Sequence, residues 1–283
     1  MKYLILGARG MAGHVVALYL KEQGNEVRGF ARQPSPVCDT IVGDALDANT
    51  VHEAIYANHY DAVINCVGVL NRAVDRNLTN GIFLNSYFPH FVADCCDDVG
   101  AKFIHISSDC VFSGRSAGYV ETDIPDEHSY YGRSKYLGEV TSGLHLSFRT
   151  SIIGPELKEG GVGLFNWFMH ESNPVSGYAR VMWSGVTTIE LSKAIGKAVE
   201  QNLSGLYFLS NNEMISKHDL LCLFNKYCQG GKAEILKADL PISNKTLICT
   251  RNDFEYKVPS YESMVRDMSE WIQAHKELYG QYI

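Results

Sequence analysis

The sequence lacks the features that mark membrane proteins, nucleic-acid-binding proteins and disulfide-stabilised domains. No segment has the roughly eighteen consecutive apolar residues that a membrane-spanning helix needs. No run of lysine or arginine offsets the net charge of -7, so we expect no nucleic-acid partner. The eight cysteines include no Cys-x-x-Cys pair, and the ten histidines are not spaced as metal ligands. We therefore expect reduced thiols, no disulfide framework and no metal site.

Length and composition fit a globular protein with a large core. A chain of 283 residues can bury roughly three quarters of its unfolded surface, so it needs no covalent cross-link. It contains 46% apolar and 20% charged residues, as ordinary globular proteins do. The chain starts with a strand-like segment rather than a charged-then-apolar leader, so we expect a cytoplasmic protein with no membrane association.

The N-terminal segment combines an apolar strand, a glycine-rich turn and the start of a helix. Residues 3–6 are apolar, Gly7, Gly10 and Gly13 follow at three-residue spacing, and residues 15–20 are helix-like. Gly7 allows a tight turn, Gly10 lets the backbone approach a phosphate, and Gly13 lets the helix pack close to the strand. The unpaired N–H groups of the helix start favour a pyrophosphate. This segment predicts a dinucleotide-binding site.

Short apolar runs alternate with helical stretches through the first half of the chain, which indicates β-α-β units and a parallel sheet. The expected strands are residues 2–6, 26–30, 40–42, 62–65, 102–106, 146–149 and 205–209. The expected helices are residues 13–23, 48–57, 88–99, 130–142, 186–200, 217–227 and 262–275.

These elements predict an α/β fold, a Rossmann-type doubly wound parallel sheet with a smaller C-terminal substrate-binding lobe. We expect residues 1–151 to form the dinucleotide-binding domain, to which residues 186–210 return, and residues 152–185 and 211–283 to form the lobe. The site is expected at the carboxyl ends of the strands, where loops and helix starts converge.

Polar residues follow the fourth and fifth strands, and a Tyr-x-x-x-Lys motif opens the next helix. Its Tyr131 and Lys135 are one helical turn apart on the same face. A phenol has a pKa near 10, and an ammonium at ~4 Å would favour the phenolate by about 4 kcal/mol before desolvation. We therefore expect Lys135 to lower the Tyr131 pKa into the range of general acid–base catalysis, with Ser108 holding the reacting oxygen. The alternative is that Tyr131 is a half-buried surface residue beside an ordinary Ser107-Ser108 loop.

Together these motifs resemble the extended short-chain dehydrogenase/reductase family, and within it the dTDP-4-dehydrorhamnose reductases and related nucleotide-sugar reductases. The resemblance is strong from residue 1 to about residue 151 and thin beyond. The segments that carry it, besides the glycine turn, are residues 63–68, 73–75, 105–114, 131–139 and 149–151.

The resemblance implies a catalytic triad of Ser108, Tyr131 and Lys135, in which Lys135 also contacts the nicotinamide ribose. It implies that Asn85 supports the site, although a helix cap is an alternative for this residue. Two positions depart from the family: Cys110 replaces a tyrosine and Ile152 replaces a tryptophan of the sugar pocket. The lost aromatic area favours a bulkier substrate, such as a UDP-linked 4-keto-6-deoxy-2-acetamido hexose, over the rhamnose precursor.

The expected cofactor is NADP, with NADPH preferred over NADH. No carboxylate follows the second strand to repel a 2′-phosphate, and Arg32 can pair with one, helped by Arg9. The alternative is that both arginines are solvated surface residues. By resemblance Asp44 lies against the adenine, with a helix cap as its alternative. The expected cofactor-binding residues are Gly7, Arg9, Gly10, Met11, Gly13, Arg32, Asp44, Asn65, Cys66, Val67 and Lys135.

The sequence is thus interpreted as an NADPH-dependent reductase of a nucleotide-linked 4-keto-6-deoxy sugar. A homodimer is compatible with this interpretation. The expected substrate-binding residues are Ser108, Asp109, Cys110, Tyr131, Asn166, Trp167 and Trp183. A core position is the alternative for Trp167 and for its apolar neighbours Leu164, Phe165 and Phe168. Two other functions stay open: an epimerase or dehydratase of the same fold, and a non-catalytic NADP-binding regulatory subunit. The missing acidic residue after the second strand disfavours an epimerase, and the intact Ser-Tyr-Lys set disfavours a regulatory subunit.

Overall fold

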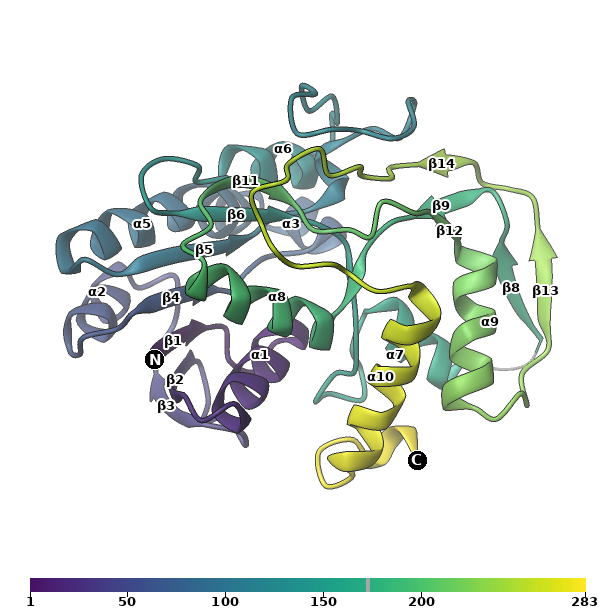
Figure 1. The fold of residues 1–283 in the computed structure, drawn as a ribbon, viewed down its shortest axis with the longest axis horizontal. Coiled ribbons are helices and arrows are strands. Elements are labelled where there is room, and N and C mark those ends of the chain that lie inside the picture. Colours follow the sequence, from purple (N-terminus) through teal and green to yellow (C-terminus); the bar gives the residue numbers. More distant parts are fainter. Residues whose placement is uncertain (172–173) are drawn as a thin grey trace.

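A seven-stranded parallel sheet forms the centre of the protein in the computed structural model, which describes residues 1–171 and 174–283 (Figure 1). The strand order is β11-β6-β5-β4-β1-β2-β3, so the chain runs outward from β1 in one direction and then from β4 in the other. The cleft for a ligand in such a sheet lies above this reversal, between β1 and β4. The strands are β1 (Lys2–Leu6), β2 (Glu26–Ala31), β3 (Asp39–Val42), β4 (Ala62–Asn65), β5 (Lys102–Ile106), β6 (Leu146–Arg149) and β11 (Gly205–Phe208).

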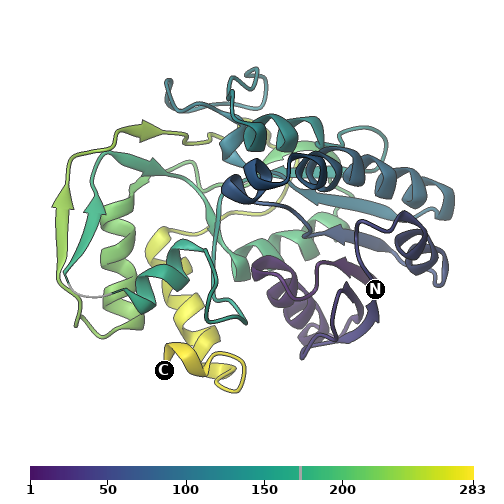
Figure 2. The same ribbon diagram turned by 180° about the vertical axis from the view of Figure 1, so that it is seen from behind.

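Helices cover both faces of the sheet and confirm the expected Rossmann-type fold. Helices α1 (Met11–Glu22) and α8 (Thr188–Glu200) lie together on the face nearer the viewer in Figure 1. The opposite face is seen in Figure 2. It carries α2 (Ala48–Tyr56), α3 (Asn71–Arg76), α4 (Leu78–Ile82), η1 (Phe83–Tyr87), α5 (Phe88–Val99) and α6 (Tyr130–Leu137).

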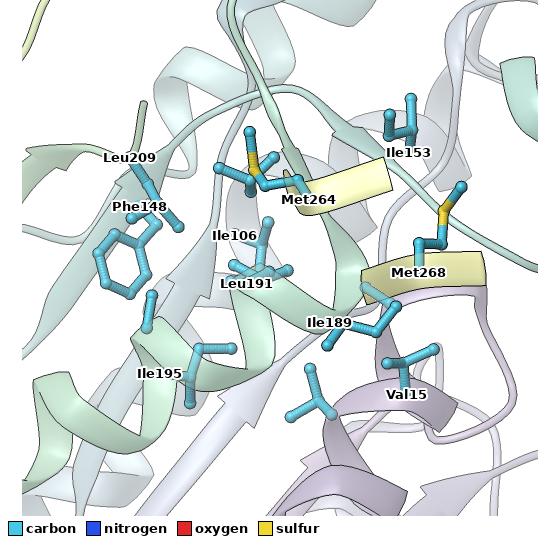
Figure 3. Packing of buried hydrophobic residues seen from close by; sticks show 14 of the residues in the cluster. Val15, Ile106, Phe148, Ile153, Ile189, Leu191, Ile195, Leu209, Met264 and Met268 are labelled. Carbon is cyan, nitrogen blue, oxygen red and sulfur yellow. The ribbon is translucent and has the colours of Figure 1, made fainter. Parts of the chain in front are cut away.

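Two apolar cores hold the helices on the two faces of the sheet. Successive side chains of a strand point to opposite faces, so neighbouring residues of one strand belong to different cores. Tyr3 and Ile5 of β1 pack in the core with α1 and α8, whereas Leu4 and Leu6 pack in the core with α2 and α5. Because both faces are covered, the central strands β1 and β4 are apolar and buried over residues 3–6 and 62–64. Figure 3 shows the first core, where side chains of α1, α8 and α10 converge on β5 and β6.

The later part of the chain builds a smaller lobe beside the sheet, on the right of Figure 1. Its α10 packs against α8 and α9, which joins the lobe to the sheet domain. Three small sheets pair β7 with β10, β9 with β12 and β14, and β8 with β13. η2 (Asp109–Val111) follows β5 of the central sheet. The later elements are β7 (Ile152–Ile153), α7 (Leu164–His170), β8 (Val175–Tyr178), β9 (Val181–Trp183), β10 (Val186–Thr187), β12 (Ile215–Ser216), α9 (Lys217–Cys228), β13 (Ile235–Ala238), β14 (Ser243–Asn244), α10 (Tyr261–Ala274) and η3 (Gly280–Tyr282).

Two expected helices are shorter than their sequence patterns, and the first is α6. Helix α6 ends at Leu137 instead of residue 142. The chain leaves the helix because the Glu139 carboxylate turns inward to accept hydrogen bonds from Ser107 Oγ and Arg149 Nε. The next backbone N–H, that of Val140, donates to Ser147 Oγ at 2.9 Å. Tertiary hydrogen bonds therefore replace the last helical turn.

The expected helix at residues 186–200 begins later, at Thr188. Val186 and Thr187 instead form β10, which pairs with β7. The Thr187 hydroxyl then accepts the N–H of Glu190 and starts α8. A two-residue strand is too short to leave a periodic signal in the sequence.

All eight cysteines are free thiols. Over residues 1–171 and 174–283, no group of histidine, cysteine, aspartate or glutamate side chains is placed to hold a metal ion. No helix within those ranges is both long enough and apolar enough to cross a bilayer.

Candidate active site

The glycine turn joins β1 to α1 at the reversal of strand order. Gly7 has φ +82°, and its N–H donates to the Phe30 carbonyl of β2 at 2.9 Å. A Cβ on Gly13 would lie 2.2 Å from the Gly7 carbonyl oxygen, so only glycine lets the helix approach the strand this closely. No side chain caps α1, and the N–H groups of its first turn have no intrahelical acceptor. These N–H groups can bind a phosphate, as the spacing predicts.

The close approach of α6 to the loop after β5 brings Ser108 and Tyr131 together. A Cβ on Gly132 would lie 2.4 Å from the Cys110 carbonyl oxygen, so glycine permits this contact. The side chain of Ser129 caps α6 by accepting the N–H of Gly132. The Ser108 hydroxyl donates to Asp109 Oδ1 at 3.3 Å and accepts the Cys110 N–H at 3.0 Å, and both Ser108 and Tyr131 line the cavity. A carbonyl oxygen in the cavity could contact both hydroxyls.

Lys135 lies one turn from Tyr131, but its ammonium nitrogen is engaged elsewhere. Nζ donates to the Ile106 carbonyl at 2.7 Å and lies 3.2 Å from His105 Nε2. Burial raises the pKa of Tyr131 well above its usual value, and the nearby Cys110 and Asp109 add to the rise, whereas the Ser108 hydroxyl opposes it. The expected lowering of the Tyr131 pKa by Lys135 is therefore wrong, because burial of the phenol outweighs any effect of the amine. A protonated phenol suits a proton donor.

Asn65 and Asn85 hold the loop after β4 instead of facing a ligand. Asn65 is fully buried and accepts the Val67 N–H at 2.9 Å, so it does not line the cavity and its expected direct contact with the cofactor is corrected to a role in loop shape. Asn85 accepts the Val69 N–H at 2.8 Å and donates to the Val69 carbonyl and to Ser134 Oγ. Asn85 thus ties this loop to α6, and the alternative of a helix cap is wrong.

One cavity of about 960 Å³ joins the glycine turn to the Ser-Tyr-Lys set. Its wall includes the expected Gly10, Met11, Cys66, Val67, Ser108, Asp109, Cys110, Tyr131, Lys135 and Trp183. It also includes Ile152, the second position that departs from the family. The volume is at the upper end of the range for small-molecule sites, about 300–1,000 Å³.

Trp183 is the one expected lobe residue that reaches this cavity. Its ring lies on the cavity wall, and its Nε1 donates to Ser151 Oγ at 2.8 Å. Lys217 Nζ lies 5.6 Å from the centre of the ring. The tertiary fold therefore brings a tryptophan from another segment to the cavity that Ile152 also lines.

The expected contacts of Asn166 and Trp167 with the substrate are not supported by their positions. Asn166 is buried, with Nδ2 donating to the carbonyls of Glu159 and Gly161 and Oδ1 accepting from the Tyr282 hydroxyl. Trp167 is 40% exposed and lines, with Asn166, a separate hollow of about 440 Å³. Both belong to α7, a short helix whose cavity-facing side could not be read from the sequence.

Arg9 lies in the turn between β1 and α1, and Arg32 and Asp44 follow the carboxyl ends of β2 and β3; none of the three lines the cavity. Arg9 donates to the Pro34 carbonyl, which brings it to the segment that follows β2 and carries the exposed Arg32. Asp44 is exposed and accepts the Leu46 N–H at 3.0 Å. The cap of α2 is Asp47, so the alternative of a helix cap for Asp44 is wrong.

The sequence interpretation missed three cationic residues of the cavity wall. Arg72 and Arg76 are four residues apart on α3, a spacing that places both on one face, and Lys217 is the first residue of α9. None of the three has a hydrogen bond or ion pair with a protein group in the described ranges. The i,i+4 arginine spacing was the available signal for the first two. Lys217 had none, because it comes from a distant segment.

Known proteins show similarity over most of the chain. The family model described as RmlD substrate binding domain matches residues 1–241. A probable low-salt glycan biosynthesis reductase, Agl14, from Haloferax volcanii is 36% identical over 143 residues, 49% of this chain and 48% of that protein. The alignment therefore spans about half the length of that relative.

Two further similarities extend over more of the chain. Methionine adenosyltransferase 2 subunit beta from Bos taurus is 26% identical over 244 residues, 78% of this chain and 70% of that protein. The solved structure of a dTDP-4-dehydrorhamnose reductase from Bacillus anthracis, in complex with NADP, has a TM-score of 0.78 at 20% identity. The similarity covers 96% of this chain and 98% of the Bacillus anthracis chain, so the two proteins share their fold.

Proposed function

We propose, from the premise that the chain belongs to the RmlD substrate binding domain family, that it is a nucleotide-sugar 4-ketoreductase. It reduces the C4 keto group of a nucleotide-linked 4-keto-6-deoxy sugar with NADPH, in the synthesis of a cell-surface polysaccharide precursor. The family match confirms the resemblance found in the sequence motifs. The reaction, the cofactor preference and the substrate are our proposal.

The observation that carries the proposal is the single cavity shared by the uncapped start of α1 and the Ser108, Tyr131 and Lys135 side chains. The first supports a pyrophosphate, and the second supports proton transfer to a carbonyl. The residues fit a bound dinucleotide. The missing Cβ of Gly13 lets α1 start close against the turn, and the uncapped start of α1 lines the cavity. Arg9 and Arg32 are proposed to bind the 2′-phosphate of NADP, and Asp44 the adenine.

NADPH, when bound, supplies a hydride to the C4 carbonyl carbon. Tyr131 donates the proton to the carbonyl oxygen, and its raised pKa keeps the phenol protonated at neutral pH. Ser108 donates a hydrogen bond to the same oxygen and so orients the carbonyl. Lys135, which lines the same cavity, would hold the nicotinamide ribose of the bound cofactor. Hydride and proton together convert the ketone to an alcohol.

Three cations of the wall have no hydrogen-bond or ion-pair partner among the residues that the structure describes, and they support an anionic substrate. Arg72, Arg76 and Lys217 line the cavity, as do the carboxylates of Asp109 and Glu156. The cavity wall thus carries several cations although the whole chain has a net charge of -7. Guanidinium groups bind phosphate oxygens in a bidentate manner. We assign the diphosphate of the nucleotide sugar to the α3 arginines and the sugar to the lobe formed by residues 152–185 and 211–283.

The sugar pocket supports a substrate larger than the rhamnose precursor. Cys110 and Ile152 line the cavity in place of two aromatic residues, and Trp183 provides a ring from another direction. We propose a UDP-linked 4-keto-6-deoxy-2-acetamido hexose as the substrate class.

The test is to follow NADPH oxidation with a panel of dTDP- and UDP-linked 4-keto-6-deoxy sugars and to compare kcat/KM. We expect turnover with at least one, a higher kcat/KM for the UDP-linked acetamido sugar, and a lower KM for NADPH than for NADH. A clear preference for dTDP-4-dehydrorhamnose would refute the substrate class. No turnover with any member would refute the reductase.

The similarity to the bovine methionine adenosyltransferase subunit supports a second candidate, a non-catalytic NADP-binding regulatory subunit. In that case the purified chain would bind NADPH, reduce no keto sugar and change the kinetics of a partner enzyme. The same panel, followed by NADPH-binding titration, separates the two candidates.

A further inference from the structure

The segment from Tyr279 to Tyr282, near the end marked C in Figure 1, connects two parts of the cavity wall. It follows α10 and includes η3, and both tyrosine rings are buried. Tyr279 bonds to a residue of α1, and Tyr282 bonds to the loop from Glu156 to Gly163. Residues of that loop and of the start of α1 line the cavity.

Tyr279 ties α10 to the glycine turn through a chain of buried hydrogen bonds. Burial lowers the pKa of His14 to about 4, so its imidazole is neutral at neutral pH. His14 Nδ1 lies 2.8 Å from the Gly10 carbonyl oxygen, which can only accept, so Nδ1 carries the proton. His14 Nε2 then accepts the Tyr279 hydroxyl at 2.9 Å. The Tyr279 oxygen accepts the Trp271 N–H at 3.2 Å. The carbonyl of the phosphate-binding turn is thus held from α10.

The Tyr282 hydroxyl holds the loop at its start and at its middle. The Asn166 amide donates through Nδ2 to the carbonyls of Glu159 and Gly161, at 3.1 and 3.0 Å. Its Oδ1 therefore accepts the Tyr282 O–H, at 2.6 Å. The Tyr282 oxygen accepts the Glu156 N–H at 3.0 Å. One hydroxyl thus connects the first residue of the loop with the side chain that holds its middle.

The loop is closed around the Glu156 side chain and reaches the start of α1. Glu156 Oε1 accepts the Gly163 N–H at 2.7 Å, and the Gln281 amide donates to the Glu156 carbonyl. A Cβ on Gly161 would lie 2.3 Å from Glu156 Oε2, so the loop wraps closely around this carboxylate. A Cβ on Gly163 would lie 3.1 Å from Met11 Sδ. The end of the loop therefore lies against the first residue of α1.

We propose that Tyr279, Gln281 and Tyr282 are positioning residues for the dinucleotide. They hold the loop from Glu156 to Gly163 beside the uncapped start of α1 before the ligand binds. A pyrophosphate at this helix start then meets a loop that is already in place, so binding does not cost the ordering of that loop. The three side chains act through the loop and through α1. The inference rests on the proposed function in that the ligand is NADPH.

The first experiment removes the Tyr282 hydroxyl and measures NADPH binding by fluorescence titration. Tyr282→Phe keeps the ring contacts with Phe165 and His170, whose ring centres lie 5.2 and 5.7 Å away, and loses only the hydrogen bonds. We expect Kd for NADPH to rise about tenfold, mostly through faster dissociation. Tyr279→Phe should change Kd in the same direction, because it breaks the tie to the glycine turn.

Tyr256→Phe is the matched control for the loss of a tyrosine hydroxyl. The half-buried Tyr256 donates to the Glu190 carboxylate, and neither residue lines the cavity. This variant should have a lower Tm and the Kd of wild type. Equal Kd values for wild type, Tyr279→Phe and Tyr282→Phe would overturn the proposal. An equal rise for Tyr256→Phe would also overturn it, since a general loss of stability would then explain the effect.

A pair of substitutions at Gln281 tests the third hydrogen bond. Gln281→Met and Gln281→Lys both place an unbranched side chain there, but only lysine keeps an N–H donor for the Glu156 carbonyl. We expect the rise in Kd for methionine and a Kd near that of wild type for lysine. The same Kd in both variants would refute the role of Gln281.

Hydrogen exchange without any ligand tests the positioning itself. Peptides that cover residues 156–163 should exchange faster in Tyr282→Phe than in wild type and in Tyr256→Phe. Unchanged exchange would overturn the proposal, whether or not NADPH binds. If wild type binds NADPH and no variant changes Kd, this inference alone fails. If wild type binds no NADPH, the proposed function fails together with it.

Discussion

Replacing Glu139 by glutamine should destabilise the fold strongly and reduce activity. The Glu139 carboxylate forms a buried ion pair with Arg149, and the two side chains are 5% and 2% exposed. It also accepts the Ser107 hydroxyl at 2.7 Å, next to the proposed catalytic Ser108. Arg149 lies between the rings of Phe112 and Phe208, each 5.1 Å from its guanidinium carbon. The guanidinium therefore has no access to water when its partner loses charge.

Removal of one partner from a buried ion pair costs about 3–5 kcal/mol. Glutamine keeps one oxygen acceptor, so we expect the lower limit, about 3 kcal/mol, a roughly hundredfold loss in the ratio of folded to unfolded protein. Urea unfolding followed by circular dichroism measures this, and Tm should fall by about 6–12 °C. Glu262→Gln, which breaks an exposed pair with Lys226, should give no resolvable loss. A loss below about 1 kcal/mol for Glu139→Gln would refute the reasoning.

Three further substitutions test the site. Tyr131→Phe should lower kcat by about 10²–10⁴-fold while the Kd for NADPH stays unchanged, because only the proton donor is lost; stopped-flow reduction rates comparable to wild type would contradict this. Gly13→Ala should abolish NADPH binding in a fluorescence titration and lower Tm, since its Cβ would lie 2.2 Å from a carbonyl oxygen, whereas Gly160→Ala, with nothing within 4 Å, should do neither. Trp183→Phe should raise KM for the nucleotide sugar about tenfold through lost ring contact, and Trp167→Phe should leave it unchanged; equal effects would refute our placement of the sugar.

The fold was largely predictable because its signals are local. Four of the six strands expected in the first half of the chain have the predicted bounds, and the helix at residues 88–99 also does. Apolar runs and glycine spacing are patterns within one segment. They can therefore be read from the sequence without knowing which other segment packs against it. The end of α6 was not predictable, since Glu139 just after the helix binds Arg149, which is ten residues further along the chain on β6.

The candidate site divides in the same way. The positions of Ser108, Tyr131 and Lys135 follow from strand ends and from one helical turn, and the structure brings them to one cavity. The pKa of Tyr131 did not follow, because burial and the competing partners of Lys135 depend on the packed surroundings.

The sequence by itself determined the strand–turn–helix unit at the N-terminus, the Ser-Tyr-Lys order and the lack of a carboxylate after β2. Only the tertiary structure decided that Trp183 and not Trp167 faces the cavity, and that Lys217 joins its wall. Backbone periodicity is encoded between near neighbours. The direction of a side chain on a short element is decided by the distant segments that pack against it, and those meet only in the folded chain.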